Sequence, residues 1–237
     1  MRPVTSQRAL LLFARLPVLG QVKTRLTPRF TPEEALALHR ALLIDSLDLV
    51  RRCAELAGAR SFLYLSEEGR LDAELAAPLG ATVLRFQKGN DLGERLQHAF
   101  EDCLGDESRE IVVVGSDSPH LPTAYVARAF EELGRAEIVL GPARDGGYYL
   151  LGASRLHPAL LSNMPWGTSQ LYRETVRRAR KEGIPIASLP AWYDVDLPEA
   201  VVQLWQELTL RRSRGEAEVP RACMALLDTW SRQGRLA

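Results

Sequence analysis

The fold of this chain is decided by the stretch Ile111-Val112-Val113-Val114-Gly115-Ser116-Asp117-Ser118-Pro119-His120-Leu121-Pro122. Its four consecutive β-branched residues predict a strand buried on both faces, as strands of parallel sheets are. Gly115 permits a turn, and Pro119 and Pro122 prevent the strand from continuing. Asp117 is therefore expected at the carboxyl end of a central strand, where open α/β sheets bind ligands. The plainer alternative is that Asp117 only caps the turn.

Strands and helices alternate along most of the chain. Strands are expected at residues 9–14, 61–65, 81–86, 111–114, 137–140, 148–152 and 184–189. Helices are expected at residues 31–56, 71–77, 91–104, 124–133, 168–181, 198–210 and 217–230. Their starts are marked by capping residues, such as the capping box of Thr31 and Glu34, and by Thr123 and Thr168 or Ser169. This alternation predicts a mostly parallel, doubly wound sheet.

Composition excludes several classes of protein. The 237 residues are 46% hydrophobic, which suits one large domain or one domain with an appendage. Thirty basic and thirty acidic residues cancel, so no overall field attracts nucleic acid or an anionic membrane. Three widely spaced cysteines form no CxxC pair, which indicates reduced thiols in a cytoplasmic protein. The apolar run at residues 9–14 is too short for a signal sequence or a membrane span.

Charged residues follow the first and the last predicted strands. The loop at residues 15–26 carries three cations that can bind phosphates, Arg15, Lys23 and Arg25, although a solvated basic loop is an equal alternative. Asp194 and Asp196 alternate along an extended segment, so their side chains are expected to face the same way. Carboxylates sharing one divalent ion opposite a basic loop would hold a diphosphate, and hard oxygen ligands suit Mg²⁺ or Mn²⁺.

Two glycine-containing loops also follow predicted strands. Residues 87–95 are either a ligand-facing corner or an ordinary strand-to-helix loop. The glycines after Asp145 either make a tight turn or let the backbone approach a ligand, and the flanking Asp145 and Tyr148 favour the second interpretation. Trp166 can wall a pocket or be a buried structural residue. His39 has no second ligand at metal spacing, so a structural or exposed position is expected.

Six segments of the chain together carry a family pattern. They are P-x-x-G-x-V-K-T-R-L at 17–26, residues 87–95, G-S-D-S-P at 115–119, G-P-A-x-D-G-G-Y-Y at 141–149, residues 166–168, and D-V-D-x-P at 194–198. On these segments the chain resembles the bacterial DUF2064 family, also described as arsenosugar-biosynthesis-type glycosyltransferases of the GT-A superfamily of nucleotide-diphospho-sugar transferases. The resemblance implies a Rossmann-like three-layer α/β/α fold with a mostly parallel central sheet. Residues 1–210 would form the GT-A transferase domain, and residues 211–237 a helical appendage packed on it.

The resemblance also implies roles for single residues. Asp117 and Asp196 would bind Mg²⁺ or Mn²⁺, with Asp194 a third ligand or a supporting neighbour. Phosphate contacts would come from Lys23 and Arg25. The nucleotide site as a whole would comprise Gly20, Lys23, Arg25, Gln87, Gly89, Ser116 and Asp117, with Gln87 and Gly89 at the nucleobase. The expected catalytic set is Lys23, Arg25, Asp117 and Asp145, and Asp145 is the candidate base for the acceptor. The expected acceptor pocket is formed by Gly146, Gly147, Tyr148 and Trp166.

Departures from the family pattern bear on the reaction. The motif S-D-S keeps only the central acid, Leu197 stands where relatives place a threonine, and the glycine-rich first loop of nucleotidyltransferases is reduced to Gly20. We therefore expect a metal-dependent glycosyltransferase that uses a nucleotide sugar and a small-molecule acceptor. One alternative is a guanylyltransferase-like nucleotidyltransferase that joins a nucleoside triphosphate to a small phosphorylated acid. The other is a catalytically inert nucleotide-binding protein.

Overall fold

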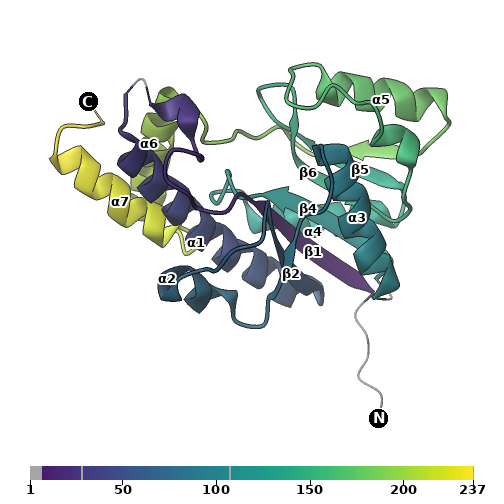
Figure 1. Cartoon of the computed structure of the whole chain (residues 1–237), viewed down its shortest axis with the longest axis horizontal. Helices are drawn as coiled ribbons and strands as arrows, with labels where there is room; N and C mark the ends of the chain where they lie inside the picture. The colour runs from purple at the N-terminus through teal and green to yellow at the C-terminus, as the bar shows by residue number, and fades with distance from the viewer. Residues whose placement is uncertain (1–6, 28, 107, 237) are drawn as a thin grey trace, which may run out of the picture.

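The computed structural model describes residues 7–27, 29–106 and 108–236. Within them a single mixed sheet runs through the middle of the molecule, with helices on both faces (Figure 1). The strands are β1 Arg8–Ala14, β2 Arg60–Leu65, β3 Val83–Phe86, β4 Glu110–Gly115, β5 Ile138–Pro142, β6 Tyr148–Ala153 and β7 Ile186–Ser188. The helices are α1 Pro32–Ala57, α2 Ala73–Ala76, α3 Leu92–Gly105, α4 Thr123–Leu133, α5 Leu171–Lys181, α6 Pro198–Ser213 and α7 Arg221–Arg232. Short 3-10 turns are η1 Thr24–Leu26, η2 Ala77–Leu79 and η3 Pro158–Leu160.

The strand order is β3-β2-β1-β4-β6-β5-β7. All neighbouring strands are parallel except β6, which is antiparallel to both β4 and β5. The predicted mostly parallel sheet is therefore confirmed. The return strand expected at residues 148–152 is β6, and it lies between β4 and β5. The strand that organises the sequence, β4, lies at the centre of the sheet, with Ile111 to Val114 buried.

The two faces of the sheet bury alternate residues of each strand. Leu10 and Leu12 of β1 pack in the core formed with α1 and α4. Ala9 and Leu11 pack in the opposite core, formed with α3 and α5. All four side chains are completely buried. Burial on both faces explains the uninterrupted apolar runs of the strands, and it produces the three-layer α/β/α architecture that the resemblance implied.

A third core joins the two ends of the chain. The first half of α1 packs against α6 and α7, with Leu38, Leu204 and Leu227 fully buried between them. These helices gather on one side of the molecule in Figure 1. The buried carboxylate of Asp45 on α1 accepts hydrogen bonds from the backbone N–H of Ala222 (3.0 Å) and Cys223 (2.7 Å) at the start of α7. The boundary expected at residue 210 falls within α6, and the division into a domain and an appendage stays a prediction.

Helix starts were predicted with mixed success. The capping box of α1 is confirmed, because Thr31 accepts from the Glu34 N–H and Glu34 accepts from the Thr31 N–H. The cap predicted at Thr123 was wrong, since Thr123 is the first residue of α4 and its hydroxyl donates to Glu218. The start of α5 is also later than predicted, because the Thr168 hydroxyl donates back to the Pro165 carbonyl.

Several other elements are shorter than predicted. The helix expected at residues 71–77 is reduced to α2 and the turn η2, and the strand expected at 184–189 is reduced to β7. The last helix begins at Arg221 instead of residue 217. All three cysteines are free and buried. No helix of the described part of the chain has the length and apolarity needed to span a membrane.

Candidate functional site

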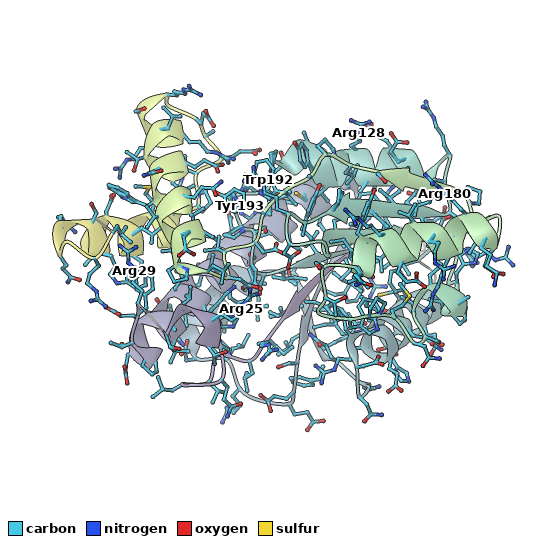
Figure 2. All side chains as sticks on the ribbon, turned by 90° about the horizontal axis from the view of Figure 1, so that it is seen from above. Arg25, Arg29, Arg128, Arg180, Trp192 and Tyr193 are labelled. Carbon is cyan, nitrogen blue, oxygen red and sulfur yellow. The ribbon has the colours of Figure 1, made fainter. Side chains whose placement is uncertain are left out.

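A cleft of about 550 Å³ opens along the carboxyl ends of β1, β2, β3 and β4. This size is in the range of small-molecule sites. Its lining includes strand-end residues and the basic loop after β1, and among the predicted nucleotide-site residues it contains Lys23, Arg25, Gln87, Ser116 and Asp117. Gly20 and Gly89 belong to the same loops but do not line the cleft. Figure 2 shows Arg25 over the middle of the molecule, whereas Arg180 lies out on α5.

Lys23 is the centre of the charge arrangement in the cleft. Its Nζ lies 2.6 Å from Asp117 Oδ1 and 2.6 Å from Asp196 Oδ1. The Lys23 side chain is only 4% exposed, whereas the two carboxylates are 37% and 35% exposed. Arg25 reaches Asp196 only at 3.8 Å and is 61% exposed. The two predicted metal ligands therefore converge on one point, and an ammonium group lies at that point.

The backbone of Lys23 has an unusual conformation. With φ 49° and ψ 36° it is left-handed, a region that non-glycine residues rarely adopt. Lys23 directly precedes η1, so this conformation is the turn that aims its side chain between the carboxylates. The two ion pairs, and the hydrogen bond from the Leu26 N–H to the Lys23 carbonyl, accompany a backbone conformation that lysine rarely adopts.

Lys23 and Asp117 reinforce each other's ionisation. Burial lowers the pKa of Lys23, but Asp117 and Asp196 more than offset burial, so the pKa lies above its ordinary value. Burial raises the pKa of Asp117, but the Lys23 ammonium more than offsets it, so this pKa lies below its ordinary value. Lys23 and Asp117 are therefore both charged at neutral pH.

Backbone contacts explain why two distant acidic segments meet. The Val195 N–H donates to the Asp117 carbonyl at 2.9 Å. Ser118 Oγ lies 2.8 Å from the Tyr193 carbonyl oxygen and 2.6 Å from Asp194 Oδ1. The loop after β4 is therefore fastened to residues 193–195, which places Asp196 beside Asp117.

Asp194 does not share the position of Asp196. The segment is not a regular strand, and Asp194 contacts Ser118 instead of lining the cleft. The single hydroxyl hydrogen of Ser118 faces two acceptors, which favours a proton on Asp194. Burial, together with neighbouring acids that include Asp117, raises the pKa of Asp194 to about 6. Its role as a third metal ligand stays a prediction.

Two polar side chains hold the strand ends that border the cleft. His39 is buried, as a structural role requires, and its Nε2 lies 3.0 Å from the Arg15 carbonyl oxygen. Burial lowers the pKa of His39, so the neutral ring donates this hydrogen bond. Gln87 Nε2 donates to the carbonyls of Tyr64 (2.9 Å) and Ala14 (3.3 Å), which joins β1 and β2 to the end of β3. The nucleobase role of Gln87 stays a prediction.

Arg95 is a cleft residue that sequence reasoning missed. It lines the cleft from the first turn of α3, and its Nε donates to the Gly89 carbonyl at 3.1 Å. Its position in the sequence could have identified it. Arg95 is a cation in the first turn of a helix that starts at a ligand-facing corner, four residues after the capping Asp91.

The predicted acceptor residues do not line the cleft. Asp145 Oδ1 accepts from the Gly147 N–H at 2.9 Å and so closes the turn before β6. Gly146 has φ 93°, and its carbonyl accepts from the Tyr172 N–H. The rings of Tyr148 and Trp166 meet edge to face, 6.2 Å apart, at the margin of the core under α3. The acceptor role of these residues stays a prediction.

The carboxylate pair offers few ligands to a divalent ion. No group of three or more His, Cys, Asp or Glu side chains could hold a metal among residues 7–27, 29–106 and 108–236. Asp117 and Asp196 nevertheless aim one oxygen each at a common point and are both more than one third exposed. Mg²⁺ typically takes one or two carboxylates and fills its other positions with phosphate oxygens and water. Two carboxylate oxygens therefore fit such an ion as part of its set of ligands.

The fold and the site define a class of enzyme. A crystal structure described as a nucleotide-diphospho-sugar transferase of Desulfovibrio desulfuricans G20 matches 98% of this chain and 97% of its own, with a TM-score of 0.78 and 28% identity. The chain is thus a transferase of this fold class.

The chain belongs to the DUF2064 family, described as an uncharacterized protein conserved in bacteria, which matches residues 49–168. It is 31% identical over 191 residues to 3-phospho-D-glycerate guanylyltransferase of Phenylobacterium zucineum (strain HLK1), covering 77% of this chain and 83% of that protein. It is 28% identical over 171 residues to 2-phospho-L-lactate guanylyltransferase of Methanothermobacter thermautotrophicus, covering 72% and 71%. The predicted family is therefore confirmed, and the relatives' names favour the nucleotidyltransferase alternative over the glycosyltransferase expectation.

Proposed function

We propose that this protein is a nucleotidyltransferase that joins a nucleoside monophosphate, from GTP as the first candidate donor, to the phosphate of a small phosphorylated carboxylic acid. The observation that carries the proposal is the convergence of Asp117 and Asp196 on one cationic point, beside the exposed Arg25. Both guanylyltransferase relatives are named for small phosphorylated acids.

The charges of the cleft suit two anionic substrates. Its basic lining residues are Arg15, Lys23, Arg25 and Arg95. A nucleoside triphosphate and a phosphorylated acid repel each other, and cations between them lower that repulsion. Arginine in particular suits the oxygens of phosphates and carboxylates, because its donors form a planar fork.

The reaction follows from these groups. An oxygen of the acceptor phosphate attacks the α-phosphorus, the bond from that phosphorus to the α,β-bridging oxygen breaks, and pyrophosphate leaves. Lys23 and Arg25 stabilise the negative charge that develops on pyrophosphate. A divalent ion held by Asp117 and Asp196 would neutralise phosphate charge and align the donor. A phosphate monoester, with its second pKa near 6, is already anionic at neutral pH, so the acceptor requires no general base.

Glycosyl transfer is the second candidate, supported by the description of the D. desulfuricans structure. In that reaction a nucleoside diphosphate leaves, and an acceptor hydroxyl must lose a proton. Asp145, which closes the turn before β6, is the candidate base. Asp145→Asn keeps an oxygen to accept from the Gly147 N–H. We expect this variant to retain its rate within about threefold in nucleotidyl transfer, whereas loss of a general base would lower a glycosyl-transfer rate by ~10²-fold or more.

The leaving group distinguishes nucleotidyl transfer from glycosyl transfer. The enzyme is incubated with Mg²⁺ or Mn²⁺, each nucleoside triphosphate, and 3-phosphoglycerate or 2-phospholactate, and pyrophosphate is measured. Acceptor-dependent pyrophosphate release is the expected result. Release of a nucleoside diphosphate from a nucleotide sugar would overturn the proposal in favour of glycosyl transfer. Nucleotide binding without turnover of any nucleoside triphosphate or nucleotide sugar would support the inert alternative.

A further inference from the structure

We infer that Lys23 occupies the divalent-cation position between Asp117 and Asp196 until a metal–nucleotide complex displaces it, so the metal enters the site with the nucleotide and not ahead of it. This inference rests on the metal-dependent site of the proposed function. It assigns Lys23 two successive partners, first the carboxylates and then the phosphates.

The geometry places Lys23 and the ion in competition. The ammonium lies 2.6 Å from one oxygen of each carboxylate, which are the same two oxygens that converge toward a shared ion. Two cations held a few ångströms apart in a partly buried site repel each other strongly. An ion that binds both carboxylates must therefore move the ammonium away.

The surroundings give Lys23 another partner. The phosphates of a bound nucleotide would lie in the same cleft, which Lys23 and Arg25 both line. A lysine ammonium on a flexible four-carbon stem can exchange a carboxylate for a phosphate oxygen without leaving the cleft. A metal ion alone brings no phosphate and so gives the ammonium no replacement partner.

Charge explains why this order matters. Two adjacent carboxylates without a cation would repel each other and attract any divalent ion. With Lys23 between them, only one net negative charge remains on the trio. The same lysine therefore keeps the acidic pair compact and lowers its affinity for free metal ions.

The test measures Mn²⁺ binding without nucleotide, by electron paramagnetic resonance and by titration calorimetry. Lys23→Met should bind Mn²⁺ at least ~10-fold more tightly than the wild type, and Mn²⁺ alone should raise its melting temperature, whereas the wild type should respond weakly. Lys23→Asn serves as a second variant, because asparagine tolerates the left-handed conformation. Adding Asp117→Asn to Lys23→Met should abolish the gain, which locates the ion at the carboxylate pair.

Arg25→Met is the matched control. It removes an equal charge from the same loop, but its guanidinium lies 3.8 Å from Asp196, farther than the Lys23 ammonium. Its Mn²⁺ affinity should change by less than about threefold. The inference is overturned if both Lys23 variants bind Mn²⁺ no more tightly than the wild type, or if Arg25→Met gains as much. Pyrophosphate release by the wild type would still support the proposed function in that case, so the two failures are distinguishable.

Discussion

At the scale of single residues, Asp117 carries the sharpest consequence. Asp117→Asn should keep the fold, because the Asp117 backbone carbonyl, and not its side chain, accepts the hydrogen bond from Val195. The amide loses the charge that a divalent ion requires. We expect GTP affinity in Mn²⁺ to fall by ~10-fold or more, and GTP affinity in chelator to change little. Calorimetric titration with and without Mn²⁺ measures both, and equal affinities for wild type and variant in Mn²⁺ would remove the metal from this site.

Asp194 makes a prediction about pH. Its folded-state pKa is about 6 against an ordinary value of 3.8. Between these values the folded protein keeps a proton that the unfolded chain has lost, so stability falls as pH rises through this window. The change is at most about 3 kcal/mol, from ~1.4 kcal/mol per pKa unit.

Asp194→Asn removes this titration. The unfolding free energy of the variant minus that of the wild type should therefore be larger at pH 7 than at pH 4. Urea unfolding of both proteins at the two pH values measures this difference. A difference between the two proteins that is the same at both pH values would show that Asp194 does not titrate in this range.

The sequence predicted that Asp117 and Lys23 follow strands at one edge of the sheet, but it did not predict that they pair. Asp117 and Lys23 were predictable because each follows a strand of a parallel sheet, and such strand ends share one edge. The insertion of Lys23 between two acids was not predictable, since it depends on the left-handed turn at Lys23 and on the contact from Val195 to Asp117. Asp194 and Asp196 are oriented differently because Asp194 contacts the Ser118 hydroxyl, whereas Asp196 contacts Lys23.

At the scale of elements, the close approach of α3 to the segment after η3 depends on Gly93. A Cβ at Gly93 would lie 2.2 Å from the Leu161 carbonyl oxygen and 2.9 Å from Trp166 Nε1. Gly93→Ala should therefore cost about 1–3 kcal/mol of stability, as overpacking does. A Cβ at Gly105, in the same helix, would meet no atom within 4 Å. Gly105→Ala should be neutral or stabilise by up to ~1 kcal/mol. Urea unfolding compares the two variants, and equal stabilities would contradict the close approach.

Local signals predicted the type of most elements, and distant partners decided their ends and order. The periodicity of α1 and its capping box are local, so its start was predictable. Thr123 does not cap α4, because its hydroxyl donates to Glu218, a residue far along the chain. The position of β6 between β4 and β5 was also beyond local patterns, since strand order depends on pairing between separated segments.

At the scale of the whole molecule, Asp45 joins the end of the chain to its beginning. Asp45→Ala would leave two N–H groups at the start of α7 without their acceptor, at a cost of about 1–3 kcal/mol. We expect faster hydrogen exchange in residues 221–232. Asp48→Ala is the control, because Asp48 lies on the same helix with its side chain 49% exposed and pairs with Arg51 and Arg52 near the surface. Unchanged exchange in Asp45→Ala would show that α7 docks through its apolar face alone.

The antiparallel strand β6 has a consequence for synthesis on the ribosome. Strands β1 to β4 are complete once residue 115 has been made, but one edge of β4 is covered only by β6, which ends at residue 153. During that interval the nascent chain presents an apolar strand with unpaired backbone groups, which is a template for association between chains. Because β5 and β6 form an antiparallel hairpin, β6 can pair with the open edge of β4 while already paired with β5.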